Sequence, residues 1–301
     1  MDLSKLVTEQ SCPEYATLDA GSTMDIVAMC NQADKTVADA VSLCLPEISH
    51  AVDLVVQQLQ NGGRLFYIGA GTSGRIGVLD AAECPPTFNT PKELVQALMA
   101  GGAAAVFEAV EGAEDDPQMG GLDLQNHGVS QRDVIIGISA SGRTPYVRGA
   151  LQYARSVQAK TIALSCNKGA EISEWANVPI EVLTGPEVLM GSTRLKAGTA
   201  QKMVLNMIST ATMVKLGKVY RNLMVDLKAS NEKLVERSKR IVMQAAQCSY
   251  ESAQRALAEA QGDVKAAILM LERGLHREHA QSILMEASGV LREALRISRS
   301  R

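Results

Sequence analysis

Two segments of this chain place small residues and hydroxyl side chains directly after an apolar run. Residues 69–74, Gly-Ala-Gly-Thr-Ser-Gly, end the run 65–69 with the G-x-G-x-x-G spacing of a dinucleotide-binding turn. Residues 139–144, Ser-Ala-Ser-Gly-Arg-Thr, follow the run 134–138. Hydroxyls and backbone N–H groups at a helix start bind anions, so two such loops at one sheet edge indicate a phosphorylated ligand. The predicted contacts are Gly71, Thr72, Ser73, Ser139, Ser141, Gly142 and Thr144.

Two other interpretations of these loops compete with a phosphate site. A dinucleotide site requires an acidic residue about 20 positions further on, at the end of the second strand. Here the span 83–91 carries three prolines, and the run 94–99 is followed by Ala-Gly-Gly, so the acidic partner is missing. The hydroxyls could instead be ordinary helix N-caps. A second loop of the same chemistry favours the phosphorylated ligand over ordinary caps, and the missing acidic residue disfavours a dinucleotide.

The elements that hold these loops follow from apolar spacing. Residues 1–21 are polar and predict an extended arm, whereas residues 22–60 have helical spacing that Pro46 divides into two helices. Short apolar runs predict strands covered on both faces, at 65–69, 94–99, 134–138, 161–165 and 178–183. Helical patterns cover 145–157, 195–216, 232–246, 249–260, 263–272 and 277–297. The alternation predicts an α/β fold, a three-layer αβα sandwich around a five-stranded parallel sheet, followed by a small helical bundle.

Composition narrows the class of protein. With a net charge of −3 and 3% aromatic residues, the chain lacks the positive charge and the stacking surfaces that nucleic-acid binding requires. It has no stretch of about 20 apolar residues that would span a membrane, and its first 20 residues do not have the pattern of a signal peptide. Its six cysteines form no C-x-x-C pair. We therefore expect a cytoplasmic protein without structural disulfides.

The paired loops resemble those of the sugar isomerase (SIS) fold, whose members bind phosphosugars. Two longer segments, "GAGTSGRIGVLDAAECPPTF" (69–88) and "TGPEVLMGSTRLKAGTAQKMVLNMIST" (184–210), are similar to signatures of the N-acetylmuramic acid 6-phosphate etherase family. The resemblance covers nearly the whole chain, and residues 249–271 also resemble the ubiquitin-associated-like unit at that family's end. It implies a lyase that removes D-lactate from the sugar's C3 ether by C2 proton abstraction, elimination and water addition, in cell-wall sugar recycling. No metal or other cofactor is implied.

Such an elimination requires one carboxyl group as an acid and another as a base. Glu83 is predicted at the end of the first loop's helix, where a negative charge is mildly unfavourable, and this misfit favours a function over a surface glutamate. The resemblance makes Glu83 the proton donor. Glu114 lies in the acidic run "EGAEDD", which on its own is typical of a solvated loop. Only the resemblance makes it the proton acceptor at C2.

Cations in the motif loops are candidates for the lactyl carboxylate and the phosphate, because arginine binds such groups in a bidentate manner. Each of them could instead be a surface charge. The candidates are Arg75, Arg143, Arg194 and Lys196, with hydroxyl contacts from Ser192 and Thr193 and sugar contacts from Glu187. His276 and His279 form an H-x-x-H pair without a third ligand nearby, so we expect no metal site.

The resemblance also suggests a domain organisation and an assembly. We expect an arm and helices over 1–52, the SIS domain over 53–225, and a helical domain over 230–301 with the three-helix unit at about 235–275. The small residues of 195–216, together with the assembly that the resemblance implies, suggest a homodimer with shared active sites. Two alternatives remain: a sugar phosphate isomerase on the same fold, and a non-catalytic regulator that binds a sugar phosphate.

Overall fold

Five strands form one parallel sheet in the computed structural model, which describes residues 6–227 and 231–299. They are β1 (Leu65–Gly69), β2 (Val95–Met99), β3 (Val134–Ile138), β4 (Lys160–Ser165) and β5 (Val178–Glu181). The spatial order is β2-β1-β3-β4-β5, and every neighbouring pair is parallel. Residues of β1 and β3 are fully buried, as expected for central strands that are covered on both faces. The five predicted strands are confirmed, although β5 ends at Glu181, two residues before its predicted end.

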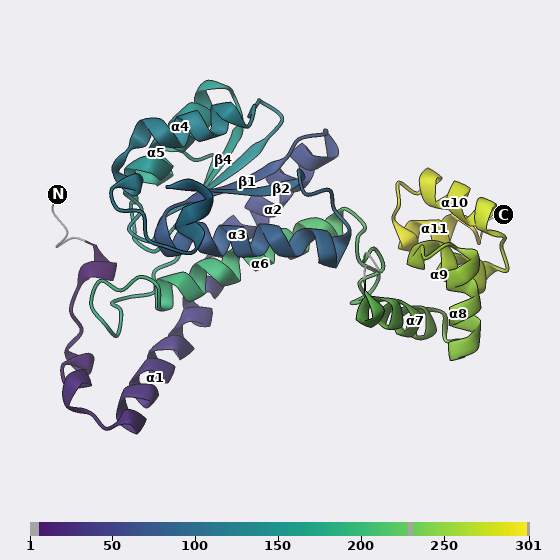
Figure 1. The fold of residues 1–301 in the computed structure, drawn as a ribbon, viewed down its shortest axis with the longest axis horizontal. Helices are drawn as coiled ribbons and strands as arrows, with labels where there is room; N and C mark the ends of the chain where they lie inside the picture. Colours follow the sequence, from purple (N-terminus) through teal and green to yellow (C-terminus); the bar gives the residue numbers. More distant parts are fainter. Residues whose placement is uncertain (1–5, 228–230, 300–301) are drawn as a thin grey trace. The chain divides into compact units, whose positions relative to one another are not determined.

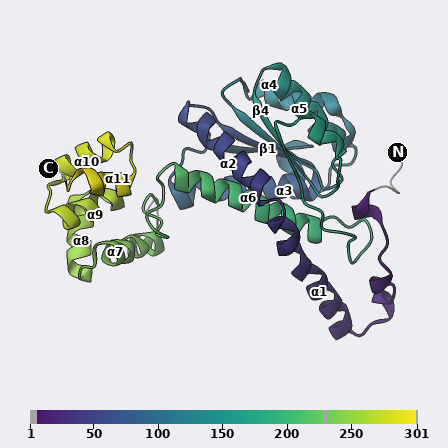
Figure 2. The ribbon, with the colours of Figure 1, turned by 180° about the vertical axis from the view of Figure 1, so that it is seen from behind.

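Helices cover both faces of the sheet (Figures 1 and 2). On one face, α4 and α5 pack over Phe66, Ile68 and Ile135, and the alternate residue Tyr67 faces α3 on the other side. The helices are α2 (Leu45–Gln60), α3 (Gly71–Phe88), α4 (Pro117–Asn126), α5 (Pro145–Ser156) and α6 (Lys196–Lys215). Short 3₁₀ turns are η4 (Gly102–Val106), η5 (Ala113–Asp115) and η6 (Glu171–Trp175). This is the predicted three-layer αβα sandwich.

The strand order creates a switch point between β1 and β3. From β1 the chain crosses to β2 on one side, and then returns to β3 on the other side. Gly69, the last residue of β1, is in register with Ile138, the last residue of β3. Ligands of open α/β sheets bind at the carboxyl ends of strands at such a switch point. Both hydroxyl-rich loops therefore begin at the edge where a ligand is expected.

The N-terminal segment is not the extended arm that its polarity predicts. It contains the 3₁₀ turns η1 (Val7–Glu9), η2 (Pro13–Tyr15) and η3 (Leu18–Ala20), followed by α1 (Thr23–Ser42). Ser22 and Asp25 form a reciprocal capping box that fixes the start of α1. The division of the next stretch at Pro46 is confirmed, because Pro46 lies in the first turn of α2, where a missing N–H costs nothing.

Contacts divide the chain into two compact units. One comprises Met1–Ala82 and Lys92–Ser209, and the other comprises Glu83–Pro91 and Thr210–Arg301. The boundaries fall inside α3 and α6, so the ends of these two helices group with the C-terminal residues. The domain limits expected from the sequence remain predictions.

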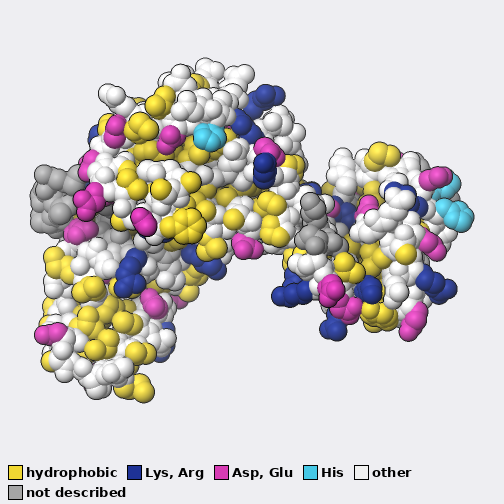
Figure 3. Space-filling view, in the orientation of Figure 1, with side chains coloured by type: hydrophobic (Ala, Val, Ile, Leu, Met, Phe, Trp, Pro, Cys, Tyr) yellow, Lys and Arg dark blue, Asp and Glu magenta, His cyan; other side chains and the backbone are white. Residues whose placement is uncertain are grey.

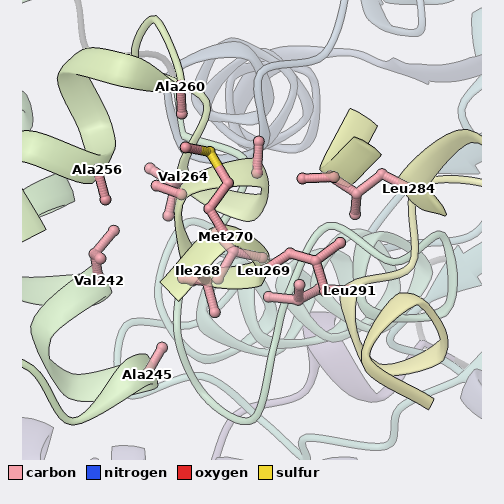
Figure 4. Close-up of a cluster of buried hydrophobic side chains, with 14 of the residues drawn as sticks. Val242, Ala245, Ala256, Ala260, Val264, Ile268, Leu269, Met270, Leu284 and Leu291 are labelled. Carbon is pink, nitrogen blue, oxygen red and sulfur yellow. The ribbon is translucent and has the colours of Figure 1, made fainter. Parts of the chain in front are cut away.

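Besides the ends of α3 and α6, the described residues of the second unit form five complete helices, arranged around an alanine- and leucine-rich core (Figure 4). They are α7 (Glu232–Ala246), α8 (Tyr250–Glu259), α9 (Val264–Arg273), α10 (Arg277–Glu286) and α11 (Leu291–Ile297). The expectation of one helix over 277–297 is wrong, since Ser288 and Gly289 adopt φ of +52° and +76° and interrupt it. The buried Lys265 Nζ bonds Gly289 O at 2.8 Å and Asp226 Oδ2 at 3.0 Å. These contacts hold the turn between α10 and α11 against α9.

Among the described residues, no helix combines the length and the apolar character that a membrane-spanning segment requires.

Candidate functional site

The G-x-G-x-x-G turn packs α3 tightly onto β1. A Cβ atom on Gly69 would lie 2.8 Å from the backbone nitrogen of Gly74, and one on Gly74 would lie 2.9 Å from Gly69 O. Gly71 opens α3 with φ of +53° and is exposed. The first and third glycines are therefore explained by helix–strand contact, and only the second leaves open backbone for a ligand.

A cavity of about 330 Å³ lies beside this turn and brings three predicted site residues together. Gly71 and Arg75 line it from α3, and Glu114 lines it from η5. Met99 and Ala100 close it at the end of β2. Since Glu111 and Asp115 also contribute, one side of this cavity is acidic. It lies at the carboxyl end of β1, next to the switch point.

Arg75 binds backbone carbonyl groups within the protein. Its Nε donates to Val106 O at 2.9 Å and its Nη2 donates to Ala105 O at 2.8 Å. These bonds tie α3 to η4, the turn that leads into the segment carrying Glu114. The prediction of Arg75 as a substrate cation did not anticipate this use of its guanidinium group.

The second loop gathers three hydroxyl groups at the carboxyl end of β3. Ser139 Oγ lies 2.7 Å from Thr144 Oγ1 and 3.3 Å from Ser141 Oγ, and it accepts a bond from the Gly142 N–H at 3.0 Å. Thr144 is the N-cap of α5 but makes no side-chain capping bond. The loop thus holds hydroxyls beside a helix N-terminus, the arrangement that suits a phosphate. Arg143 in the same loop pairs with Glu171 at 3.5 Å.

Replacing Gly142 by alanine should disrupt this loop. Its φ is +73°, and an added Cβ would lie 2.3 Å from the Cβ of Ala170. The backbone conformation alone costs an L-residue about 1–2 kcal/mol, and the collision must add to it. We expect Gly142→Ala to lower the thermal unfolding midpoint and to weaken phosphate-ester binding. Gly169→Ala is the matched control, because its φ is +63° with nothing within 4 Å of the Cβ. An equal loss in the two variants would remove the collision from this account.

The third motif segment is fixed by buried polar contacts. Glu187 is 1% exposed, and its carboxylate accepts the backbone N–H groups of Lys196 and Ala197, both at 2.9 Å. Burial raises the pKa of the Glu187 carboxyl, while these N–H bonds act in the opposite direction. Lys196 Nζ donates to Thr184 O at 2.6 Å. Glu187 and Lys196 therefore hold the start of α6, and their contacts to substrate remain predictions.

The start of α6 also meets the first loop. Ser73 is buried, and its Oγ donates to Gln201 Oε1 at 3.0 Å. Thr72 is half-buried, and its methyl carbon would lie 3.4 Å from a Cβ on Gly198. Ser192 is half-buried and Arg194 is exposed in the loop that precedes α6. All three predicted loops thus belong to the first unit, and direct contacts join the first to the third.

Glu83 lies elsewhere on α3. The expectation that it ends this helix is wrong, because α3 continues through Pro85 and Pro86 to Phe88. Glu83 is exposed, lies more than three helical turns after Gly71, and is not among the residues that line the 330 Å³ cavity. Within one chain, its neighbours therefore do not exclude water from its carboxyl group.

Two residues that the sequence analysis missed support the site. Asp80 is 5% exposed, and its carboxylate accepts bonds from Tyr67 at 2.7 Å, Asn206 at 2.6 Å and Ser209 at 3.0 Å. It fastens α3 to β1 and α6. Asn167 follows β4 at the same edge, and its Nδ2 bonds Ala140 O and Thr8 Oγ1, both at 3.0 Å. Because Asn167 follows a third strand at the same sheet edge as the two predicted loops, its place in the sequence could have marked it as a residue of the site.

Parts of the chain match known domain families and a solved structure. Residues 47–155 match the glucokinase regulatory protein N-terminal SIS domain, 117–211 the SIS domain, and 221–265 the C-terminal lid domain of glucokinase regulatory protein. A phosphoheptose isomerase structure from Francisella tularensis superposes with a TM-score of 0.50 at 18% identity, over 64% of this chain and 100% of the other. That likeness shows the fold alone.

Similarity over nearly the full length is found among curated proteins. A protein from Clostridioides difficile (strain 630) is 52% identical, over 98% of this chain and 97% of its own length. Another from Pectobacterium atrosepticum is 54% identical, also over 98% and 97%. Both are named N-acetylmuramic acid 6-phosphate etherase. The chain therefore belongs to the N-acetylmuramic acid 6-phosphate etherase family.

Proposed function

We propose that this chain is a carbon–oxygen lyase that converts N-acetylmuramic acid 6-phosphate and water into N-acetylglucosamine 6-phosphate and D-lactate. The observation that carries the proposal is identity of 52–54% to etherases over 98% of the chain. The cavity beside the first hydroxyl-rich loop, with Glu114 in its wall, supports it. Muramic acid is a cell-wall sugar, so we place the reaction in the recycling of that polymer in the cytoplasm.

The first step is proton removal from the open-chain sugar. The C2 hydrogen is acidic because it lies next to the C1 aldehyde. We assign the 6-phosphate to the hydroxyls of Ser139, Ser141 and Thr144, the last two of which lie within 3.3 Å of Ser139 Oγ. Glu114 is the base that takes the C2 proton. Positioned bases of this kind contribute about 10²–10⁴-fold in rate.

The second step breaks the C3–O bond. The electron pair of the C2–H bond forms a C2–C3 double bond, and the departing lactyl oxygen takes a proton from Glu83. D-Lactate leaves, and an unsaturated aldehyde remains. Water then adds at C3, a proton returns to C2, and ring closure gives the product. The acid matters because an alkoxide is a strong base and a poor leaving group.

We further propose a homodimer in which a second copy covers Glu83. Leu79 lies one helical turn before Glu83 on the same face of α3 and is 51% exposed. Other large apolar side chains are uncovered on the first unit, among them Met24 at 75% and Val27 at 58% on α1. Hydrophobic side chains gather on the surface over α1 (Figure 3). A second copy packed on the exposed faces of α3 and α1 would bury this apolar area, and it would also exclude water from the Glu83 carboxyl group.

The direct test is the release of D-lactate. We expect purified protein to liberate one D-lactate per N-acetylmuramic acid 6-phosphate, and none from N-acetylmuramic acid, which lacks the phosphate anchor. A coupled D-lactate dehydrogenase assay measures the product. Formation of a ketose phosphate without lactate would instead show an isomerase. Binding without any product would show a regulator, and either result would overturn the proposal.

A further inference from the structure

A second cavity, of about 630 Å³, lies at the opposite edge of the sheet from the hydroxyl-rich loops. Arg132 lies shortly before β3, and Lys160 is the first residue of β4. Asn177 lies directly before β5. From Lys160 to the far end of β4 at Ser165 the strand spans about 16 Å. This amino-edge cavity is therefore separate from the candidate active site.

The lining of this amino-edge cavity is cationic and rich in amides. Three cations line it, Arg132, Arg155 and Lys160, together with five amide side chains, and no carboxylate does so. None of the three cations forms an ion pair with a carboxylate among the described residues, whereas Arg64 and Arg148 of the same unit do. Three uncompensated cations in one cavity contrast with a chain whose net charge is −3.

Helix ends explain only one of these cations. Arg155 lies in the last turn of α5, where a cation balances the partial negative charge of the helix, and its Nη1 donates to Glu174 O at 3.2 Å. Arg132 and Lys160 are in no helix. The nearest acid in sequence, Asp133, is occupied by Arg64 at 3.0 Å. Among the described residues, Arg132 and Lys160 therefore neither balance a helix end nor pair with a carboxylate.

Gln158 contributes one of the amide side chains of the amino-edge cavity. It lines the amino-edge cavity with φ of +63°, two positions after the end of α5. That left-handed conformation is common at the end of a helix and favours glycine. The exposed side chain of Gln158 presents its amide to the cavity.

We propose that the amino-edge cavity binds a hydroxyl-rich phosphate ester such as a sugar phosphate. Arg132 and Lys160 bind the phosphate, and the amides, Gln158 among them, bind hydroxyl groups. No aromatic side chain lines the cavity, so it offers no stacking surface to a nucleotide base. This site is additional to the one that the proposed lyase reaction uses.

The only tryptophan of the chain, Trp175, lies two residues before Asn177 and reports on this cavity. We expect glucose 6-phosphate to change its fluorescence saturably, and glucose to have no effect. The double variant Arg132→Ala/Lys160→Ala should weaken apparent affinity at least about tenfold, because two charge-assisted contacts are lost. Lys92→Ala, which removes an 86% exposed cation elsewhere on the unit, should change it less than about twofold.

A second variant guards against simple misfolding. Gln158→Gly should raise the thermal unfolding midpoint while weakening glucose 6-phosphate binding, a combination that damage to the fold cannot produce. The absence of a saturable response in the unaltered protein would overturn the proposal. So would a response of unchanged affinity in Arg132→Ala/Lys160→Ala, since it would place the binding elsewhere.

Discussion

Glu83→Gln should lower kcat by about 10²–10⁴-fold while KM changes less than threefold, because glutamine keeps the shape of the side chain but cannot protonate the departing lactyl oxygen. Binding should persist because the hydroxyls of Ser139, Ser141 and Thr144, which we assign to the phosphate, are unchanged. Initial rates of D-lactate release over a range of substrate concentrations measure both constants.

The matched control for this variant is Glu93→Gln. Glu93 is an exposed glutamate in the loop after α3, where it pairs with Lys92 at 3.9 Å. It should retain the unaltered rate. If Glu83→Gln kept more than a tenth of the unaltered kcat, Glu83 would lose the donor role, whatever the control showed.

Glu114→Gln should lower kcat by a similar factor of about 10²–10⁴, for the opposite reason. The amide cannot accept the C2 proton, so every later step is prevented, including exchange of that proton with solvent. Proton NMR of the substrate in heavy water follows the exchange directly. Glu108→Gln, in the same loop but outside the cavity lining, is the control and should exchange normally. Exchange at the unaltered rate in Glu114→Gln would show that another group is the base.

The same two variants also test the shared site. If Glu83 of one copy works with Glu114 of the other, mixing the two inactive chains by unfolding and refolding should restore up to about a quarter of the activity. This is the share that statistical pairing gives to sites with both glutamates intact. Mixtures as inactive as their components would argue for sites built within single chains.

The sheet could be predicted because burial on both faces imposes continuous apolar runs. The run 134–138 has no polar residue, and the structure buries all five of its residues. The strand order then brings 69–74 and 139–144 to one edge without any further information. Loops after core strands are therefore the part of a site that sequence reveals best.

Helix α4 was not predicted, because its Gly120 and Gly121 weaken the helical signal. These glycines serve a contact with α5 that sequence does not display. A Cβ on Gly120 would lie 1.9 Å from Tyr146 O, and one on Gly149 would lie 1.8 Å from Pro117 O. The prolines of α3 had the opposite effect on the prediction. They indicated that the helix ends near Glu83, whereas it continues through Pro85 and Pro86 to Phe88.

Motif spacing also does not reveal what a side chain is bonded to. Arg75, Glu187 and Lys196 stand in motif loops, yet all three bond to backbone groups that hold those loops in place. A charge that fixes a loop and a charge that binds a substrate look alike in sequence. Asp80 shows the converse, because nothing around it distinguishes a buried carboxylate with three partners from a surface one.

The most direct measurement is the reaction in heavy water with analysis of the product by mass spectrometry and NMR. If a carboxylate removes the C2 proton before lactate leaves, N-acetylglucosamine 6-phosphate should carry one deuterium at C2. Product with only protium at C2 would contradict the elimination, and with it the placement of the sugar between two glutamates.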